Sequence, residues 1–205
     1  MPKASSELTI SRKNEIVDAC RQLYQTRSFR EITIKDIGAV TSFTRTSIYN
    51  YFQTKEEIFL AMLQQEYDLW CEELQIILET NSQMDADAFA DALAKSLEHR
   101  PSLLKLISMN HFDMEENSRQ EQLNEFKKSY GKTLDMISAC LTKFFPQMDK
   151  TQIQHFIYIF FPFLFGIYPY TTITQKQINA MQYANINFAY QSIYEITKQC
   201  IRAIL

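Results

Sequence analysis

The 205-residue chain has little of what punctuates β proteins, since it holds only three glycines and five prolines. Many short strands need many turns that contain Gly or Pro, so this scarcity argues against an all-β fold and favours long helices. The four cysteines lie far apart and form no CxxC pair, which argues against a disulfide framework and a zinc site. We therefore expect free thiols, a reducing cytoplasmic setting and no bound metal.

The chain also lacks the short motifs that carry catalysis. It contains no Gly-rich phosphate loop, no HExxH and no GxSxG, and its Cys and His residues do not cluster. Adjacent acidic pairs such as Glu56 and Glu57 would point about 100° apart on a helix, so they do not form a general acid–base dyad. We expect neither an enzyme nor a bound cofactor.

No run of the sequence is typical of a membrane segment. Residues 1–11 hold no apolar core of a signal peptide. The most apolar run, Phe156–Tyr168, has 13 residues and contains Pro162, so it is too short to cross a bilayer. We expect a helix that is buried on all sides in a core that also meets a partner.

The charge is divided unevenly along the chain. Residues 1–53 hold eight Lys or Arg and five Asp or Glu, a net charge of +3, so the remainder carries −6 of the total of −3. A basic N-terminal part, residues 1–53, joined to an acidic remainder is typical of a protein whose N-terminal module binds nucleic acid. A patch of this size also arises by chance, so the charge alone does not decide the function.

Apolar residues recur at helical spacing along most of the chain and predict an all-α fold of about nine helices. Capping boxes are expected at Thr54–Glu57 and Ser118–Glu121, and a loop at Asn110–Asn117. The last helix is expected to run without a break from about Thr174 to Ala203. Three further helices are expected to begin after the N-caps Thr33, Asp85 and Asp149.

Residues 33–59 are the most informative part of the sequence. They predict a short helix, a turn, a second short helix and the start of a third. In the second short helix Ile48 and Phe52 lie four residues apart and face a core, while hydroxyl, amide and basic side chains share the opposite face. Such a helix suits a DNA groove, where cationic and hydroxyl groups meet phosphates and other side chains reach base edges.

The segment Ile37–Phe59, IGAVTSFTRTSIYNYFQTKEEIF, resembles the helix-turn-helix of the TetR family of transcriptional regulators. The resemblance implies phosphate contacts from Thr33, Tyr51 and Lys55. It also implies a recognition helix that carries Thr44, Arg45, Thr46, Ser47, Tyr49 and Asn50. Ser42 stands where this family usually has a glycine, so we expect a turn of different shape.

The resemblance further implies a DNA-binding domain over residues 1–54 and a helical ligand-binding and dimerisation domain over residues 55–205. We expect two copies to associate through the last two helices. Aromatic and sulfur side chains concentrate in residues 55–205. They either line a cavity for an apolar or aromatic ligand or pack against each other in a core. These residues are Trp70, Met109, His111, Phe112, Phe126, Tyr130, Phe160 and Phe163.

These observations together predict a cytoplasmic, dimeric repressor. It would bind a palindromic operator in double-stranded DNA and release it when a small-molecule effector binds. The alternative is a regulatory interaction protein of the same fold whose DNA binding is lost or repurposed. The unusual residues Ser42, Phe43 and Thr46 leave that alternative open.

Overall fold

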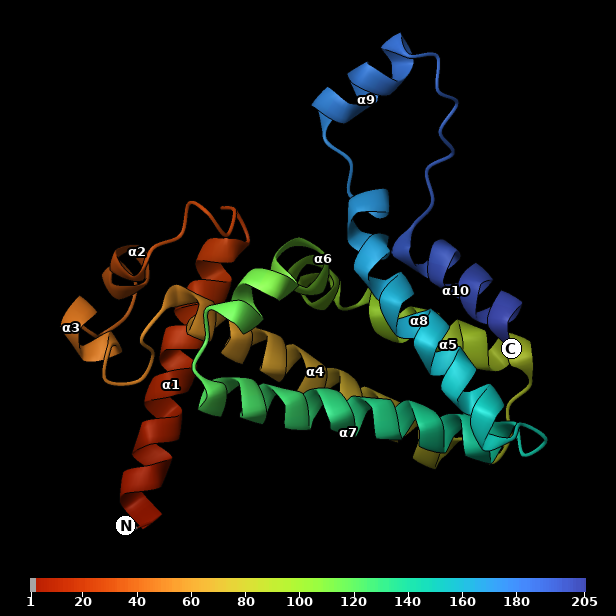
Figure 1. Cartoon of the computed structure of the whole chain (residues 1–205), viewed down its shortest axis with the longest axis horizontal. Helices are drawn as coiled ribbons and strands as arrows, with labels where there is room; N and C mark the ends of the chain where they lie inside the picture. The colour runs from red at the N-terminus through yellow and green to blue at the C-terminus, as the bar shows by residue number, and fades with distance from the viewer. Residues whose placement is uncertain (1–2) are drawn as a thin grey trace. The chain divides into compact units, whose positions relative to one another are not determined.

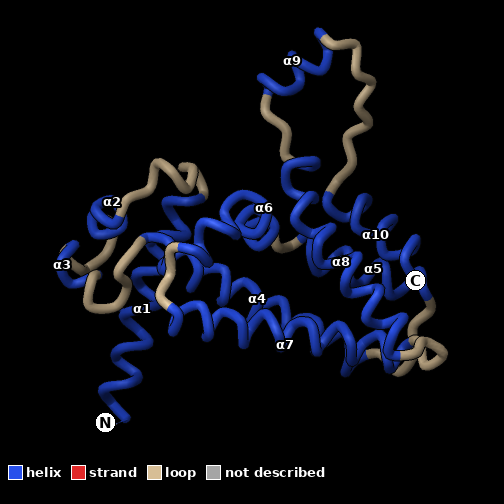
Figure 2. The backbone as a smooth tube through the Cα atoms, viewed as in Figure 1, coloured by secondary structure: helices blue, strands red, loops and turns tan. Residues whose placement is uncertain are grey.

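A computed structural model describes residues 3–205, without the side chains of residues 3–6, 109 and 110. Within that range the regular structure is helical throughout (Figures 1 and 2), so the predicted all-α fold is confirmed. The helices are α1 (Lys3–Tyr24), α2 (Ile34–Ala39), α3 (Arg45–Ile48), α4 (Lys55–Thr80), α5 (Ala86–Glu98), α6 (Pro101–Glu116), α7 (Gln120–Phe144), α8 (Lys150–Thr171), α9 (Gln175–Tyr183) and α10 (Ile193–Ile204).

The chain divides into two compact units. Unit 1 comprises Met1–Gln65 and Asn110–Lys128, and unit 2 comprises Glu66–Met109 and Ser129–Leu205. The chain passes from one unit to the other three times, and each passage lies inside a helix, namely α4, α6 or α7. Each unit is therefore assembled from segments that are distant in sequence.

Polar caps start several helices where the sequence predicts them. Thr33 caps α2 and forms a capping box with Asp36, and Asp149 does the same for α8 with Gln152. The side chain of Asp85 accepts a hydrogen bond from the backbone N–H of Ala88 at 2.8 Å. These bonds satisfy N–H groups that a helix start would otherwise leave without partners.

Two expectations about helix ends are wrong. The expected loop at Asn110–Asn117 is helical up to Glu116, because α6 continues through it. The expected last helix is broken, since α9 ends at Tyr183 and α10 begins at Ile193. Helix α9 ends next to Asn185, whose φ of 54° lies in the left-handed region typical of helix ends, and the chain stays non-helical up to Ser192.

The core of unit 1 joins the short helices to the two long ones. Ile48 and Phe52, predicted to face inward, are 0% and 1% exposed. The ring of Phe59 from α4 makes edge contacts with Tyr24 at 5.1 Å and with Phe29 at 4.7 Å between centroids. The short helices α2 and α3 are too brief to be stable alone, so this shared core fixes their positions.

The core of unit 2 centres on Trp70, which is fully buried. Its indole N–H donates to Ser96 Oγ at 3.0 Å, and its ring lies 6.1 Å from that of Phe161. Helix α10 is attached to α5 through Asp91, which accepts hydrogen bonds from Tyr194 and Lys198. Hydrogen bonds from Lys95 and Tyr194 lower the pKa of Asp91 to about 2, so it stays ionised at neutral pH.

Helix α8 is less buried than its apolar sequence predicts. It has 22 residues and is long and apolar enough to cross a membrane, but only 33% of its most apolar window is buried within the described chain. Tyr158, Ile159 and Tyr170 are 68%, 51% and 60% exposed. The expectation of burial on all sides is therefore wrong for the single chain, and α8 presents an apolar surface.

One carboxylate of unit 1 is completely buried. Glu57 accepts hydrogen bonds from Arg119 Nε at 2.6 Å, Arg119 Nη2 at 2.8 Å and the Gln53 N–H at 2.7 Å. Burial raises the pKa of Glu57, but the hydrogen bonds from Arg119 and Gln53 outweigh burial and lower it. The pair joins the first turn of α4 to the residue directly before α7, although these residues are 62 positions apart.

Neither of the two capping boxes expected from the sequence is complete. The Glu57 N–H still donates to Thr54 Oγ1 at 3.2 Å, but the Glu57 carboxylate accepts from Gln53 and Arg119 instead of closing the box. Ser118 does not cap α7, because its hydroxyl donates to the carbonyl of Met114 at 2.6 Å. Half of the first box is present, and the second prediction is wrong.

The Glu57→Gln variant should lose about 2–3 kcal/mol of the free energy of unfolding at pH 7. The loss is smaller than for a fully enclosed pair because the Arg119 side chain is 37% exposed. The folded pKa of Glu57 lies below its ordinary value of 4.5, so the stabilisation is present above that pH and is lost as the pH falls through the folded pKa. Urea denaturation followed by circular dichroism measures both effects.

The neighbouring Glu56→Gln variant is the control, because it removes the same charge from the same helical turn. It should change the free energy of unfolding by less than about 0.5 kcal/mol. If the two variants lose the same free energy of unfolding, both at pH 7 and below pH 4.5, the buried pair has no specific role.

Candidate nucleic-acid interface

Helix α3 is turned outward as its amphipathic pattern predicts. Thr44 caps it, because the Thr44 hydroxyl accepts a hydrogen bond from the Ser47 N–H at 3.2 Å. Ile48 is fully buried beneath it, while Arg45 and Thr46 are exposed and Tyr49 is 42% exposed. The helix ends at Ile48, so Tyr49, its C-cap, and Asn50 lie past its end and not on the helix as expected. Tyr51 lies in the same turn.

The polar side chains on this surface are held by contacts with each other. Arg45 donates from Nη2 to the Tyr49 hydroxyl at 3.3 Å, and its guanidinium lies 5.8 Å from the Tyr49 ring centroid. The Tyr51 hydroxyl accepts a hydrogen bond from Arg12 of α1 at 3.1 Å. Arg12 was not predicted from the sequence. The feature that could have revealed it is an exposed cation on α1, the helix that packs beneath the turn.

Lys55 holds the loop before α2 with its side chain. The ammonium donates to the carbonyls of Phe29 at 2.8 Å and Ile32 at 3.3 Å, and it lies 4.3 Å from the Phe29 ring centroid. Lys55 is half-buried. The implied contact with a phosphate stays a prediction, and the structure adds a role in fixing the loop.

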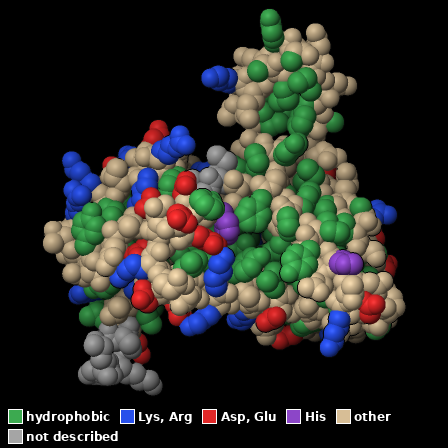
Figure 3. All heavy atoms as spheres, viewed as in Figure 1, with side chains coloured by type: hydrophobic (Ala, Val, Ile, Leu, Met, Phe, Trp, Pro, Cys, Tyr) green, Lys and Arg blue, Asp and Glu red, His purple; other side chains and the backbone are tan. Residues whose placement is uncertain are grey.

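A groove of about 420 Å³ brings four of the predicted residues together. It is open to solvent and is lined by Thr33, Arg45, Tyr49 and Lys55 together with Ile32, Ile34 and Lys35. Figure 3 shows Lys and Arg side chains gathered over the α2 and α3 segments. Lys35 was missed by sequence reasoning, although a cation in the first turn of α2 beside the cap Thr33 is a visible signal.

The turn between α2 and α3 has Ser42 at the position where the TetR family usually has a glycine. Across the described residues Asn185 alone among non-glycines has a positive φ, so Ser42 is not left-handed. The Ser42 N–H instead donates to Glu15 Oε1 of α1 at 2.8 Å, and Thr41 Oγ1 accepts from the Phe43 N–H at 3.3 Å. Hydrogen bonds from Ser42 lower the pKa of Glu15, so the carboxylate stays ionised while it holds the turn.

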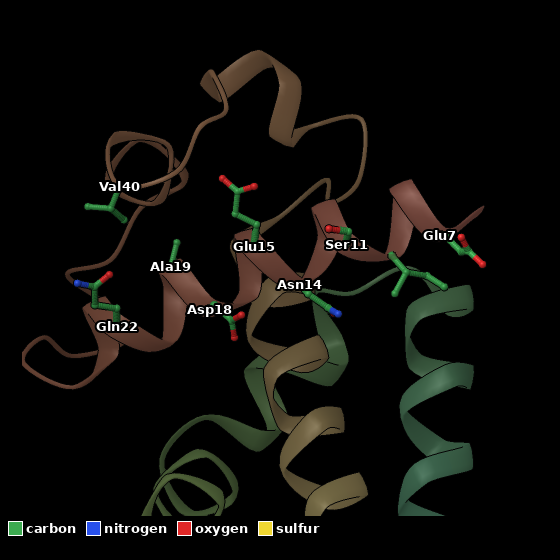
Figure 4. A pocket seen from close by; sticks show the side chains of 9 residues that line it. Glu7, Ser11, Asn14, Glu15, Asp18, Ala19, Gln22 and Val40 are labelled. Carbon is green, nitrogen blue, oxygen red and sulfur yellow. The ribbon is translucent and has the colours of Figure 1, made fainter. Parts of the chain in front are cut away.

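A larger hollow of about 740 Å³ runs along α1 and has the opposite charge. Figure 4 shows its lining, which includes the carboxylates of Glu7, Glu15 and Asp18 beside Ser11 and Asn14. Carboxylates repel DNA phosphates, so this hollow does not suit the DNA backbone. Of the two hollows, the cationic groove beside α3 is the one whose charge is complementary to DNA phosphates.

Two family models match consecutive parts of the chain. Residues 16–62 match the model described as bacterial regulatory proteins, tetR family, and residues 64–191 match the tetracyclin repressor-like C-terminal domain. The chain belongs to the TetR family. It is accordingly a DNA-binding transcriptional regulator, in a family of regulators and not of enzymes.

Individual relatives of this TetR-family chain are distant. It is 23% identical over 154 residues, 75% of each protein, to the uncharacterized HTH-type transcriptional regulator YfiR of Bacillus subtilis (strain 168). Its fold is similar to that of FadR from Bacillus halodurans, a fatty acid degradation regulator, with a TM-score of 0.60, 14% identity and 94% coverage of both chains. At this identity the likeness establishes the fold alone.

A second solved structure has an equal score. Thermus thermophilus FadR, a TetR family repressor solved in complex with lauroyl-CoA, gives a TM-score of 0.60 at 15% identity. The match covers 94% of this chain and 92% of that protein. The shared fold therefore extends over both the helix-turn-helix and the C-terminal helices.

The predicted ligand-binding residues of this TetR-family protein fall in both units. In unit 2, Trp70 and Phe160 are fully buried, and the Tyr130 ring lies 5.8 Å from that of Phe161. Phe163 is half-buried on α8. Sequence reasoning missed Phe161, which joins the rings of Trp70 and Tyr130 into one cluster.

Of the remaining members, His111, Phe112 and Phe126 belong to unit 1, and Met109 belongs to unit 2. Phe126 is fully buried, whereas Phe112 is 76% exposed. His111 Nε2 lies 3.0 Å from Glu115 Oε1, and burial lowers the pKa of His111. The side chain of Met109 lies outside the described residues. A ligand-binding role for these eight residues stays a prediction.

The Glu15→Ala variant should expose the Ser42 amide, because it removes the acceptor that holds the turn. Hydrogen exchange at Ser42, followed by NMR, should become about 2- to 10-fold faster. Glu15→Gln keeps an acceptor oxygen and should retain most of the protection. The control Asp18→Ala removes a carboxylate one turn further along α1 and should leave the Ser42 exchange rate unchanged. Equal exchange rates in all four proteins would exclude the tether.

Proposed function

We propose that this protein is a cytoplasmic, dimeric repressor that binds a palindromic DNA operator and releases it when a small apolar or aromatic ligand binds. Residues 1–54 form the DNA-binding domain in this proposal, and residues 55–205 bind the ligand and the second copy. Membership in the TetR family supports the general mechanism. The operator contacts, the dimer and the ligand are specific to the proposal.

The exposed surface of α3 is the observation that carries the DNA-binding part. Arg45, Thr46 and Tyr49 are exposed above the buried Ile48, and Thr33 and Lys55 line the same groove as Arg45. A guanidinium can form two hydrogen bonds with guanine, and hydroxyl and ammonium groups can bind phosphates. We assign base contacts to Arg45, Thr46, Tyr49 and Asn50, and backbone contacts to Thr33, Thr44, Ser47, Tyr51 and Lys55.

The exposed apolar side of α8 supports a dimer. A second copy that covered this side of α8 would remove the apolar surface of Tyr158, Ile159 and Tyr170 from solvent, which stabilises the dimer. A two-fold dimer presents two copies of α3 to the DNA, which requires a palindromic operator whose half-site spacing matches their separation. The expected last helix is divided into α9 and α10 in the structure. We therefore propose that the two copies associate through α8 and the segments that follow it.

The aromatic cluster of unit 2 supports an apolar ligand class. Lauroyl-CoA, bound by Thermus thermophilus FadR, has a long apolar chain, and that protein shares this fold. A ligand that binds better to the form unfit for DNA lowers the affinity for DNA by its differential affinity for the two forms. We propose an apolar or aromatic effector that acts in this way.

Arg45→Ala should weaken operator binding about tenfold or more and relax the preference at one base position. The operator is first selected from random DNA by the wild-type protein, and affinities are then measured by fluorescence anisotropy at several salt concentrations. Tyr49→Ala should also weaken binding, and each lost cationic contact should reduce the salt slope by about 1. The control Lys128→Ala removes an exposed charge of α7 and should change neither quantity.

The contrary result has a definite meaning. If wild-type protein selects no sequence, or if Arg45→Ala and Lys128→Ala bind equally, the protein uses this fold for an interaction other than operator binding. Circular dichroism of each variant establishes that the comparison is between folded proteins.

An apolar ligand should raise the melting temperature and release the selected operator over the same concentration range. Lauroyl-CoA, dodecanoate and an aromatic carboxylate serve as probes, with free coenzyme A as the polar control. Release should reach about 5- to 150-fold in affinity, the usual size of coupling between two sites. A ligand that stabilises the protein but leaves operator affinity unchanged would contradict the release mechanism.

A further inference from the structure

Unit 2 carries a projecting arm, which we define as residues 172–192. It leaves the C-terminal end of α8, contains α9 and returns at Ser192, the N-cap of α10 (Figures 1 and 2). No residue of α9 is buried. Tyr183 is 92% exposed, and Ile186 and Tyr190 are 55% and 56% exposed. The arm therefore offers apolar side chains to solvent at the end of α9 and along its return segment.

The path of the arm is set by specific bonds. At the end of α9 the Ile186 N–H donates to the Met181 carbonyl at 2.9 Å, and the Asn185 N–H donates to the Gln182 carbonyl at 3.1 Å. With Asn185 left-handed, these two bonds form a Schellman motif that turns the chain back. The turn places Tyr183 and Ile186 at the tip, on either side of Asn185.

The return segment is also anchored by aromatic contacts. The Phe188 ring lies 6.4 Å from that of Tyr170 in the last turn of α8 and 5.2 Å from that of Tyr190. These rings tie the base of the arm to the helix from which it projects. The arm is consequently a preorganised element, and binding through it would cost less ordering entropy than binding through a free loop.

The composition of the arm is that of a protein interface. Lys176 is the one charged residue among its 21 residues, although 22% of the whole chain is charged. Figure 3 shows hydrophobic side chains over much of the projecting part. An isolated helix of nine residues is marginal in water, and interfaces are poor in charge and rich in Tyr, Phe and Met at their centres. Both facts favour an arm that a partner covers.

We propose that this arm clasps a second copy of the same chain, next to the apolar side of α8. The inference rests on the proposed dimeric regulator and names the segment that completes its interface. Tyr170 belongs both to the exposed side of α8 and to the base of the arm, so the two surfaces are continuous. One chain carries both an arm with a single charged residue and an uncharged helix side, and a two-fold axis lets each copy cover those of the other.

The first test places a charge at the tip of the arm. Ile186→Lys should raise the dimer dissociation constant about 30-fold or more, measured by sedimentation equilibrium of the full-length protein. The matched control is Ile76→Lys on α4, because Ile76 is 58% exposed and Ile186 is 55% exposed. The control should dimerise like the wild type, and circular dichroism should be unchanged in both variants.

The second test detects the contact between copies directly. Wild-type proteins labelled with ¹⁴N and ¹⁵N are mixed, allowed to exchange and treated with a lysine-reactive crosslinker. Crosslinked peptides that contain Lys176 should carry both isotopes, which shows that the arm reaches the other copy. Crosslinks of Lys176 that never mix isotopes would overturn the inference.

The outcomes separate this inference from the proposed function. A wild-type protein that stays monomeric at all concentrations overturns both the dimeric repressor and the arm. If the wild type dimerises and Ile186→Lys has the same dimer dissociation constant as Ile76→Lys, the role of the arm is overturned and the dimeric repressor is not. Weaker dimerisation in Ile186→Lys, together with mixed-isotope crosslinks of Lys176, supports the arm.

Discussion

The bond between Glu57 and Arg119 organises unit 1. A buried carboxylate is costly unless it is paired and fully hydrogen-bonded, and here a guanidinium and two backbone N–H groups surround it. Arg119 also donates from Nη2 to the carbonyl of Tyr51 at 3.4 Å, just after the segment that presents Arg45 and Tyr49. The connection between α6 and α7 is thereby bonded to the end of the helix-turn-helix segment.

The sequence predicted well those features that depend on neighbouring residues. The caps Thr33, Asp85 and Asp149 act within one helical turn, so a local pattern reveals them. The division of α3 between the buried Ile48 and the exposed Arg45 follows from helical periodicity and is confirmed. The family resemblance of residues 37–59 was confirmed by independent family models.

The features that sequence reasoning missed depend on contacts between distant residues. Nothing near Glu57 announces that Arg119 is its partner, and nothing near Ser42 announces Glu15. The break after α9 depends on one asparagine in the left-handed region, within a pattern that otherwise reads as a continuous helix. The proposed ligand site would depend on the shape of a space among aromatic side chains, and composition does not encode that shape.

The three passages of the chain between the units restrict how this protein can be divided. A fragment that ends at residue 65 keeps α3 but loses Asn110–Lys128, and with it Arg119, the cation that neutralises Glu57. The helix-turn-helix is therefore not a detachable module of its first 65 residues. A chimera built with this helix-turn-helix must therefore carry residues 110–128 as well, because they supply the cation that pairs with Glu57.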